Sequence, residues 1–138
     1  MILSLDTYLT SNHRHDNVMK DWTGVYLPSA MKTIALASEF ASLAGFTITD
    51  ITSGWRPEWL NRNLGGAASS KHVTAQAIDI ADPDKVFGKW LAANIGALRE
   101  RGCAIESLTR THASTDPAGR WTHIQTIIPP SGNIIFMP

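Results

Sequence analysis

Several features that would assign a chain to a specialised class are missing from this sequence. It has one cysteine, Cys103, which excludes an internal disulfide and a cysteine-rich zinc module. Lys and Arg number 12, as do Asp and Glu, so the chain lacks the basic surplus that general nucleic-acid binders carry. No run of about eighteen apolar residues occurs, and the first residues do not form a basic leader followed by a long apolar stretch. We therefore expect no nucleic-acid partner, no stable membrane insertion and no signal peptide, with synthesis in the cytoplasm.

The length and composition are those of one ordinary globular domain. The 138 residues are enough to bury a core, and 43% of them are hydrophobic. No internal repeat or low-complexity tract divides the chain. We expect a single domain over residues 1–138 and a monomer.

Apolar spacing predicts an irregular alternation of helices and short strands. A stripe that includes Met31, Ile34 and Phe40 predicts a helix capped by Ser29 and stopped by Gly45. The other expected elements are strands over 46–53, 75–81, 103–112 and 120–128, a short helix over 57–63, one long helix from Asp82 to Gly102, and a closing strand within 129–136. This order indicates the α+β class, with a small, mainly antiparallel sheet flanked by helices.

Three residues in two stretches could form a metal site. In "SSKHVTAQAID" His72 precedes Asp79, and in "RWTHIQ" the alternation puts His123 on one strand face with its neighbours two positions away. Residues seven apart on an uninterrupted strand face opposite sides, so His72 and Asp79 converge only if the chain bends between them. Regular alternation begins near Ala75, which leaves "SKHVT" as a loop that can turn His72 back over the face of Asp79.

Spacing alone leaves the nature of this cluster open. A histidine on a strand is commonly a surface or hydrogen-bonded residue, and Asp79 can be a buried carboxylate held by backbone donors. A catalytic zinc needs three converging N or O ligands, which this set provides. A facial triad for non-haem iron usually has its first histidine and carboxylate closer together in sequence, which counts against iron. We interpret His13 and His15, in "SNHRHD", as surface residues.

The stretch "TSGWRPEWLNRNLGGAASSKHVTAQAIDI", followed at a distance by "WTH", resembles the signature of the M15-type zinc peptidases, the group of D-Ala-D-Ala carboxypeptidases and phage endolysins. The matching residues are Ser53, Gly54, Arg56, Asn61, Gly65, Gly66, Ser70, His72, Ala77, Asp79, Trp121 and His123. The resemblance implies the hedgehog/DD-peptidase fold and one Zn2+ ion held by His72, Asp79 and His123. It also implies that stem or cross-link peptides of bacterial peptidoglycan are the partner that is cleaved.

Two positions depart from the family pattern. Ala75 stands where the family usually has glycine, and a positive φ there would cost alanine about 1 kcal/mol. Arg120 stands three residues before His123, where many members carry an Asp or Glu as general base. Arginine cannot accept a proton at neutral pH, so another residue must act as base or the protein is inactive.

Three residues are candidates for this base. Glu106 lies on a strand that would pair beside "WTHIQ", and we favour it because a strand holds a side chain more rigidly than a loop. Asp116 lies in the loop between these strands, where its alternative role is that of a turn former before Pro117. His112 is the third candidate and is otherwise a solvated loop residue.

Four further residues are predicted to serve the site. Arg56 would clamp a substrate carboxylate or the developing oxyanion, or else form a structural salt bridge. Ser70 would bind substrate or orient the His72 loop. Trp121 would form a wall of the cleft, and Gln125 would support His123 from the same strand face.

These observations predict a zinc metallopeptidase that hydrolyses peptidoglycan peptides, either as an endopeptidase or as a D,D-carboxypeptidase. We expect a phage or prophage enzyme of lysis or of the virion, which acts at the cell wall after release or delivery. One alternative is a non-catalytic, zinc-stabilised module that binds wall peptide or a protein partner. Another is an enzyme of the same fold that acts on a small dipeptide in the cytoplasm.

Overall fold

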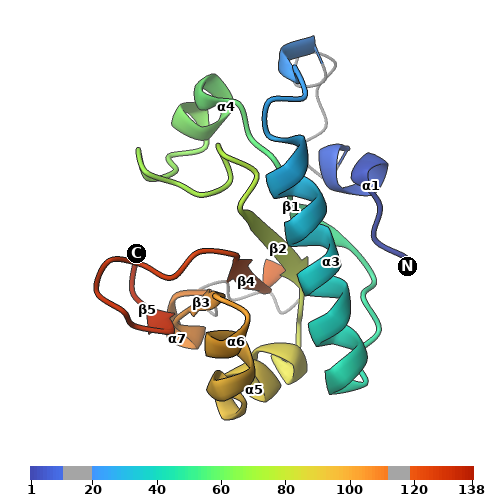
Figure 1. The fold of residues 1–138 in the computed structure, drawn as a ribbon, viewed down its shortest axis with the longest axis vertical. Coiled ribbons are helices and arrows are strands. Elements are labelled where there is room, and N and C mark those ends of the chain that lie inside the picture. The colour runs from blue at the N-terminus through green and yellow to red at the C-terminus, as the bar shows by residue number, and fades with distance from the viewer. Residues whose placement is uncertain (11–19, 112–118) are drawn as a thin grey trace.

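A five-stranded sheet with helices around it forms the centre of the protein (Figure 1). The computed structural model describes residues 1–10, 20–111 and 119–138. Its strands are β1 (Ile51–Ser53), β2 (Ala77–Ala81), β3 (Ala104–Glu106), β4 (Trp121–Gln125) and β5 (Ile135–Phe136). Its helices are α1 (Leu5–Leu9), α3 (Leu27–Ala44), α4 (Glu58–Asn63), α5 (Val86–Ala93), α6 (Ile95–Glu100) and α7 (Leu108–Thr111).

The strands lie in the order β1-β2-β4-β3-β5. The pairs β1/β2, β2/β4 and β3/β4 are antiparallel, whereas β3 and β5 run parallel. This sheet confirms the predicted α+β class with a mainly antiparallel sheet. The order places β2 and β4 side by side, although α5, α6, β3 and α7 separate them along the chain.

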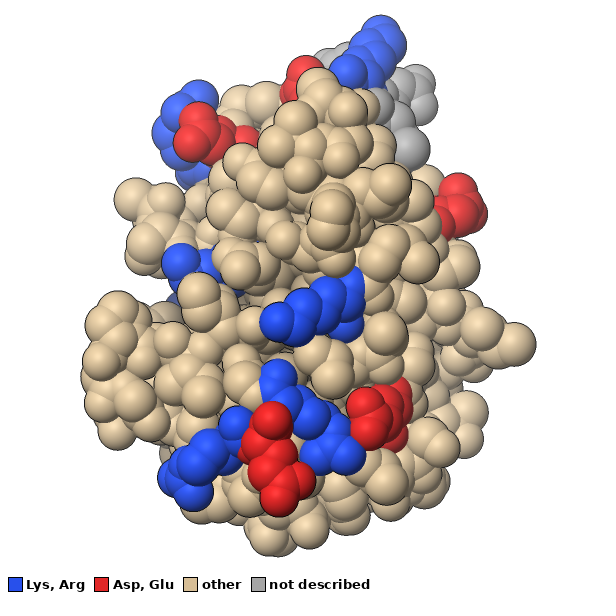
Figure 2. All heavy atoms as spheres, viewed as in Figure 1, with Lys and Arg blue, Asp and Glu red and all other residues tan. Residues whose placement is uncertain are grey.

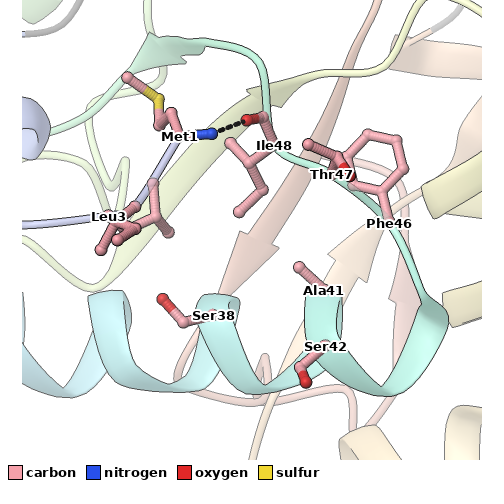
Figure 3. Close-up of a pocket in the computed structure, with 9 residues that line it drawn as sticks. Met1, Leu3, Ser38, Ala41, Ser42, Phe46, Thr47 and Ile48 are labelled. Carbon is pink, nitrogen blue, oxygen red and sulfur yellow. Dashed lines mark hydrogen bonds between the residues drawn. The ribbon is translucent and has the colours of Figure 1, made fainter.

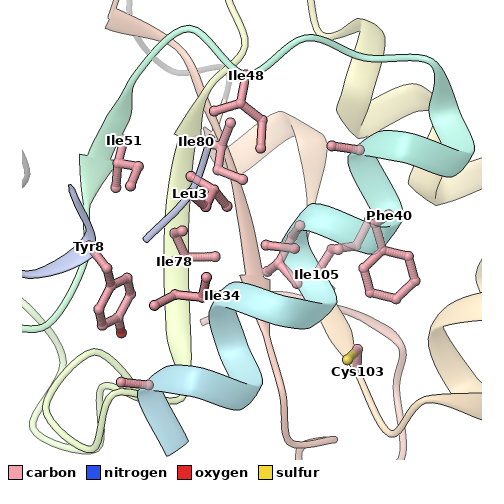
Figure 4. Close-up of a cluster of buried hydrophobic side chains, with 14 of the residues drawn as sticks. Leu3, Tyr8, Ile34, Phe40, Ile48, Ile51, Ile78, Ile80, Cys103 and Ile105 are labelled. Carbon is pink, nitrogen blue, oxygen red and sulfur yellow. The ribbon is translucent and has the colours of Figure 1, made fainter. Parts of the chain in front are cut away.

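Helix α3 provides a large part of the hydrophobic core. Ile34 and Phe40 are buried on it and form one cluster with Ile78 and Ile80 of β2 (Figure 4). The helix ends at Gly45, whose φ of 64° forms the predicted left-handed stop. Burial of this face, at about 25 cal/mol per Å² of apolar surface, is the main force that holds the helix against the sheet.

The start of α3 differs from the prediction. The helix begins at Leu27 with a proline in its first turn, so Ser29 lies inside the helix and does not cap it. Proline suits this turn because the N–H groups there have no intrahelical acceptor. Met31 is 48% exposed and lies outside the buried stripe to which it was assigned.

The single long helix predicted after Asp82 is two helices. α5 and α6 meet at Asn94, whose φ of −126° is not helical, and Ile95 after it is 38% exposed. The first of them begins at Val86 and not at Asp82, with Lys85 in the N-cap position, but the Asp82 carboxylate does accept the N–H groups of Phe87 and Gly88 in its first turn.

The strands predicted over 46–53, 75–81, 103–112 and 120–128 are all shorter in the structure, and the first and third differ most. Within 46–53, only residues 51–53 pair as a strand. After β3 the chain does not continue as a strand to residue 112. The carbonyl of Ser107 accepts the N–H groups of Arg110 and Thr111, and this starts α7 instead.

Charged residues of both signs share the face shown in Figure 2, in agreement with the zero net charge. Arg101 and Glu39, for example, form an ion pair at 2.8 Å. Among the residues that the structure describes, no helix is long and apolar enough to cross a membrane.

Candidate metal centre

His72, Asp79 and His123 come together at the centre of the sheet. Asp79 on β2 and His123 on β4 are direct cross-strand partners, so their side chains project from the same face. His72 reaches them from the loop before β2. All three residues are buried, with exposed fractions of 3% to 6%.

The carboxylate of Asp79 bridges the two imidazoles. Its Oδ1 lies 2.7 Å from Nδ1 of His123, and its Oδ2 lies 3.2 Å from Nε2 of His72. One ligand atom from each residue can be chosen so that all lie within 4.8 Å of one another. The predicted convergence of the three residues is therefore present in the fold.

Outer hydrogen bonds fix which ring nitrogen of each histidine faces the centre. Nδ1–H of His72 donates to the carbonyl of Gly54 at 2.7 Å, which leaves Nε2 for a ligand role. Nε2–H of His123 donates to Oε1 of Gln125 at 3.2 Å, which leaves Nδ1. The Gln125 amide is itself oriented, because its Nε2 donates to the carbonyl of Ile127. Supports of this kind are typical of metal-bound histidines.

A left-handed residue makes the bend that brings His72 over Asp79. Ala75 has a φ of 58° and is completely buried, so the positive φ considered for this alanine is present. The N–H of Ala75 donates to the carbonyl of His72, and that of Gln76 donates to the carbonyl of Lys71, which closes the loop on itself. The bend thus allows His72 and Asp79 to face one another, although residues seven apart on a straight strand would point to opposite sides.

The chain before this loop is anchored by a close backbone approach at Gly54. A Cβ added there would lie 2.0 Å from the carbonyl oxygen of Tyr8, so no other residue fits without movement. The N–H of Arg56 also donates to the carbonyl of His72. These contacts hold the acceptor for His72 and the histidine itself in one rigid unit.

Arg56 lies directly beside the cluster, and each nitrogen of its guanidinium faces a protein group. Nη2 is 3.6 Å from Oδ2 of Asp79, Nε donates to Ser53 Oγ at 2.8 Å, and Nη1 donates to Asn61 Oδ1 at 3.3 Å. The ion pair considered for Arg56 is therefore formed with Asp79. Binding of a substrate carboxylate by Arg56 stays a prediction.

The charges of the cluster are strongly coupled. Burial alone would raise the pKa of Asp79, but His72 and His123 outweigh it and hold that pKa well below its usual range. Burial would lower the pKa of His123, but the charge of Asp79 and its hydrogen bond raise it. The carboxylate is therefore ionised, and a metal ion at Nδ1 of His123 would have to compete with a proton for that nitrogen.

These residues fit a divalent metal ion such as zinc. Two imidazole nitrogens and one carboxylate are a known ligand set for catalytic zinc, in which a fourth position is left to water. The two nitrogens that face Asp79 are the ones not used in outer hydrogen bonds. The cluster can therefore hold a metal without any rotation of a ring.

Glu106 lies on the strand next to His123. Ala104 pairs with Gln125 and Ile105 with Ile124, so a continuation of this register would set Glu106 opposite His123 and on the same face. Glu106 is half-buried, and its charge contributes to the raised pKa of His123. This is the position that the sequence predicted for a base on a neighbouring strand, while the role itself stays a prediction.

The other predicted residues have mixed outcomes. Oγ of Ser70 accepts the N–H of His72 at 3.3 Å, which orients the loop. Trp121 is half-buried at the start of β4, on the same strand face as His123. Asp116, His112, His13 and His15 lie outside the described residues.

Sequence reasoning missed two residues near the cluster. The ring of Phe136 on β5 meets that of His123 edge-on, with centroids 6.0 Å apart. Lys85, between β2 and α5, is completely buried. No local pattern marks either residue, because their surroundings come from distant parts of the chain.

A separate hollow lies between α3 and the N-terminal segment (Figure 3). It has a volume of about 250 Å³, and its lining includes Leu3, Phe46 and Ile48. The amino group of Met1 donates to the carbonyl of Ile48 at its edge. None of its lining residues is His, Cys, Asp or Glu, so it offers no metal ligand or side-chain acid–base group.

The family model described as Peptidase M15 matches residues 8–125, which include His72, Asp79 and His123. Searches of the curated proteins and of the solved structures found no match.

Proposed function

Because the chain belongs to the peptidase M15 family, we propose that it is a zinc-dependent peptidase that hydrolyses peptide bonds of bacterial peptidoglycan. The observation that carries this proposal is the buried cluster of His72, Asp79 and His123, in which one ring nitrogen of each histidine faces the Asp79 carboxylate. The substrate is expected to be a stem or cross-link peptide, because the resemblance of the sequence is to wall peptidases. Cleavage would be of the endopeptidase or D,D-carboxypeptidase type.

The ligands would be His72 Nε2, Asp79 and His123 Nδ1. A zinc ion held there would supply a water with a pKa near 7 and polarise the scissile carbonyl. Gly54 and Gln125 would keep the two imidazoles in the required tautomers. Arg56, fixed by Ser53 and Asn61, would keep the Asp79 carboxylate ionised and oriented.

Glu106 is the proposed general base. Its place opposite His123 supports a role in taking the proton of the attacking water and passing it to the leaving amine. Arg120 stands where many family members carry the acidic general base. In this assignment the base comes from the neighbouring strand β3 and not from the residue three positions before His123.

A peptidoglycan digestion tests the proposal. The zinc-loaded protein, His123→Ala and Glu106→Gln would be incubated with purified peptidoglycan, and released amino groups would be counted. We expect release by the wild type and background levels for both variants. Glu100→Gln, an exposed carboxylate on α6, is the matched control and should keep full activity.

Each outcome has a defined meaning. Stoichiometric zinc in the wild type without released amino groups would refute the peptidase. Full activity of Glu106→Gln would refute the base while leaving the peptidase intact. The masses of the products would distinguish endopeptidase from carboxypeptidase action, and activity on a free dipeptide alone would favour a cytoplasmic substrate.

A non-catalytic binding module is the second candidate, and Arg120 favours it. If the acid of the family was lost without replacement, the cluster would retain zinc for stability while the protein binds wall peptide or a protein partner. In that case the protein should sediment with peptidoglycan and leave it intact. The first proposal includes a phage or prophage enzyme of lysis or of the virion, which acts at the cell wall after release or delivery. Lysis of bacterial cells after external addition of the purified protein would test this part.

A further inference from the structure

Lys85 is a completely buried lysine at the turn between β2 and α5. Its φ of 58° is left-handed, and it occupies the N-cap position of α5. The ammonium donates to the hydroxyl of Thr111 and to the main-chain carbonyl of Trp121. These partners are 26 and 36 residues further along the chain.

One partner lies in the helix that follows β3, and the other begins β4. Thr111 ends α7, the helix that follows β3 and its Glu106. Trp121 begins β4, two residues before His123. One side chain therefore ties the element after the proposed base to the strand that carries a metal ligand.

Asp82, in the same turn, forms hydrogen bonds with the residues on either side of Trp121. Its carboxylate accepts the hydroxyl of Thr122 at 2.6 Å, and its N–H donates to the carbonyl of Arg120 at 3.0 Å. With the bond from Lys85 to Trp121, three successive residues of β4 and its entry are held by one turn. The Asp82 carboxylate also accepts N–H groups in the first turn of α5, so this clamp is anchored on a helix.

A buried ammonium is expensive, and a role in packing alone would not require it. Both hydrogen-bond partners are neutral, and within residues 1–10, 20–111 and 119–138 no carboxylate lies at ion-pair distance from it. Burial lowers the pKa of Lys85 to about 8, against the attraction of Asp82, Asp79 and Glu106. Costly polar groups of this kind concentrate at functional sites.

We propose that Lys85 is a positioning residue, which fixes β4 relative to β3 so that His123 and Glu106 keep the separation needed for zinc binding and proton transfer. The inference rests on the proposed function, since it assigns the lysine to that same site. It acts through Trp121 and Thr111 and does not touch the reacting atoms.

Lys85→Met tests the inference, because it keeps an unbranched side chain of nearly the same length and removes the ammonium donors. We expect a zinc dissociation constant raised about tenfold, measured by competition with a chelator, since a support of a ligand is lost. In zinc-saturated protein we expect kcat to fall about a hundredfold at unchanged KM, because misplacement by about 1 Å has this effect. Lys89→Met, an exposed lysine on α5, is the matched control and should change neither quantity.

Folded Lys85→Met with wild-type zinc affinity and wild-type kcat would overturn the proposal, as would equal losses in Lys89→Met. If Lys85→Met does not fold, Thr111→Val removes one acceptor of the ammonium and should show smaller losses in the same direction; no loss in Thr111→Val would then refute the proposal. If the wild type binds zinc but releases nothing from peptidoglycan, the peptidase fails, and the zinc affinities still decide the role of Lys85.

Discussion

The two faces of strands β2 and β4 differ in chemistry although they share a backbone. On one face Ile78 and Ile80 of β2 and Ile124 of β4 are completely buried in the cluster that α3 completes. On the other face Asp79 and His123 point at one another, with His72 above them. Alternation along a strand thus assigns neighbouring residues to the core and to the site.

The comparison shows that stability and chemistry are separable at the level of single residues. The core face gains from the burial of apolar surface and needs no particular geometry beyond close packing. The site face buries polar groups, which is tolerated only because every one has a partner; within the described residues, no buried side-chain N or O atom lacks a hydrogen bond. A substitution on the core face should therefore lower stability, and a substitution on the site face should lower metal binding.

The largest effect is expected from Asp79→Asn, which breaks the site face. The amide keeps the shape but removes the charge that holds both imidazoles and would bind zinc. We expect zinc to be lost on dialysis and peptidase activity to fall to background, while the circular dichroism spectrum is retained. Metal analysis after dialysis is the measurement. Stoichiometric zinc in this variant would refute the assignment of the ligand.

The next effect is expected from Ile78→Ala, one residue away on the core face. Removal of a completely buried isoleucine side chain should lower the free energy of unfolding by about 2–5 kcal/mol. Urea denaturation in the presence of a chelator measures this without the contribution of bound metal. The zinc affinity of the folded protein should stay at the wild-type value, and a loss of affinity would show that the two faces are coupled.

Gln125→Ala tests the outer support on the site face. His123 would lose the acceptor that fixes its tautomer, and the zinc affinity should fall by about 10–100-fold. Thr126→Val is the control, because Thr126 faces the other way and contacts the hydroxyl of Thr33 in the core. Chelator competition should show a change in Gln125→Ala and none in Thr126→Val. Equal zinc affinities in the two variants would argue against a role for Gln125.

Acid should weaken zinc binding, because protons compete for Nδ1 of His123. Asp79 raises the pKa of His123 above its ordinary value of 6.5, although burial acts to lower it. This proton stabilises the metal-free fold below about pH 6.5, and the stabilisation is lost as the pH rises through the raised pKa. Below that pKa, zinc affinity should fall about tenfold per pH unit.

Titration calorimetry in two buffers of different ionisation enthalpy measures this proton directly. We expect zinc binding to release protons at pH 6.5, because the pKa of His123 in the metal-free protein is raised above this value. The number should decrease as the pH rises. Zinc binding without proton release at this pH would contradict the coupling between Asp79 and His123.

The convergence of the three residues was predictable in part from local rules, while their interpretation as zinc ligands came from the resemblance to the M15-type peptidases. The alternation of strands puts Asp79 and His123 on defined faces, and the end of regular alternation near Ala75 indicates the loop that carries His72. The stop of α3 at Gly45 was predictable for the same reason, since only local backbone sterics decide it. The match of the family to residues 8–125 agrees with the resemblance found in the sequence.

The features that the sequence did not predict depend on distant contacts. The break at Asn94 falls within an apolar pattern that continues through Leu91 and Leu98, so periodicity alone favours one helix. The short α7 follows β3 because the carbonyl of Ser107 accepts the N–H groups of Arg110 and Thr111. The residues in this segment have ordinary strand propensity, so the sequence did not indicate a helix there. Burial of Lys85 depends on Thr111 and Trp121, and composition gives no sign of it.

The smallest effect is expected from Ala75→Gly, at the bend that joins the two faces. Glycine removes the left-handed strain of alanine, about 1 kcal/mol, but also removes a completely buried methyl group, about 0.8 kcal/mol. The free energy of unfolding should therefore change by less than about 0.5 kcal/mol, with zinc affinity unchanged. Ala81→Gly on β2 has no strain to relieve and should be destabilised by about 0.5–1 kcal/mol. Equal destabilisation of the two variants in urea would show that Ala75 is unstrained, and that the bend which delivers His72 costs the fold nothing.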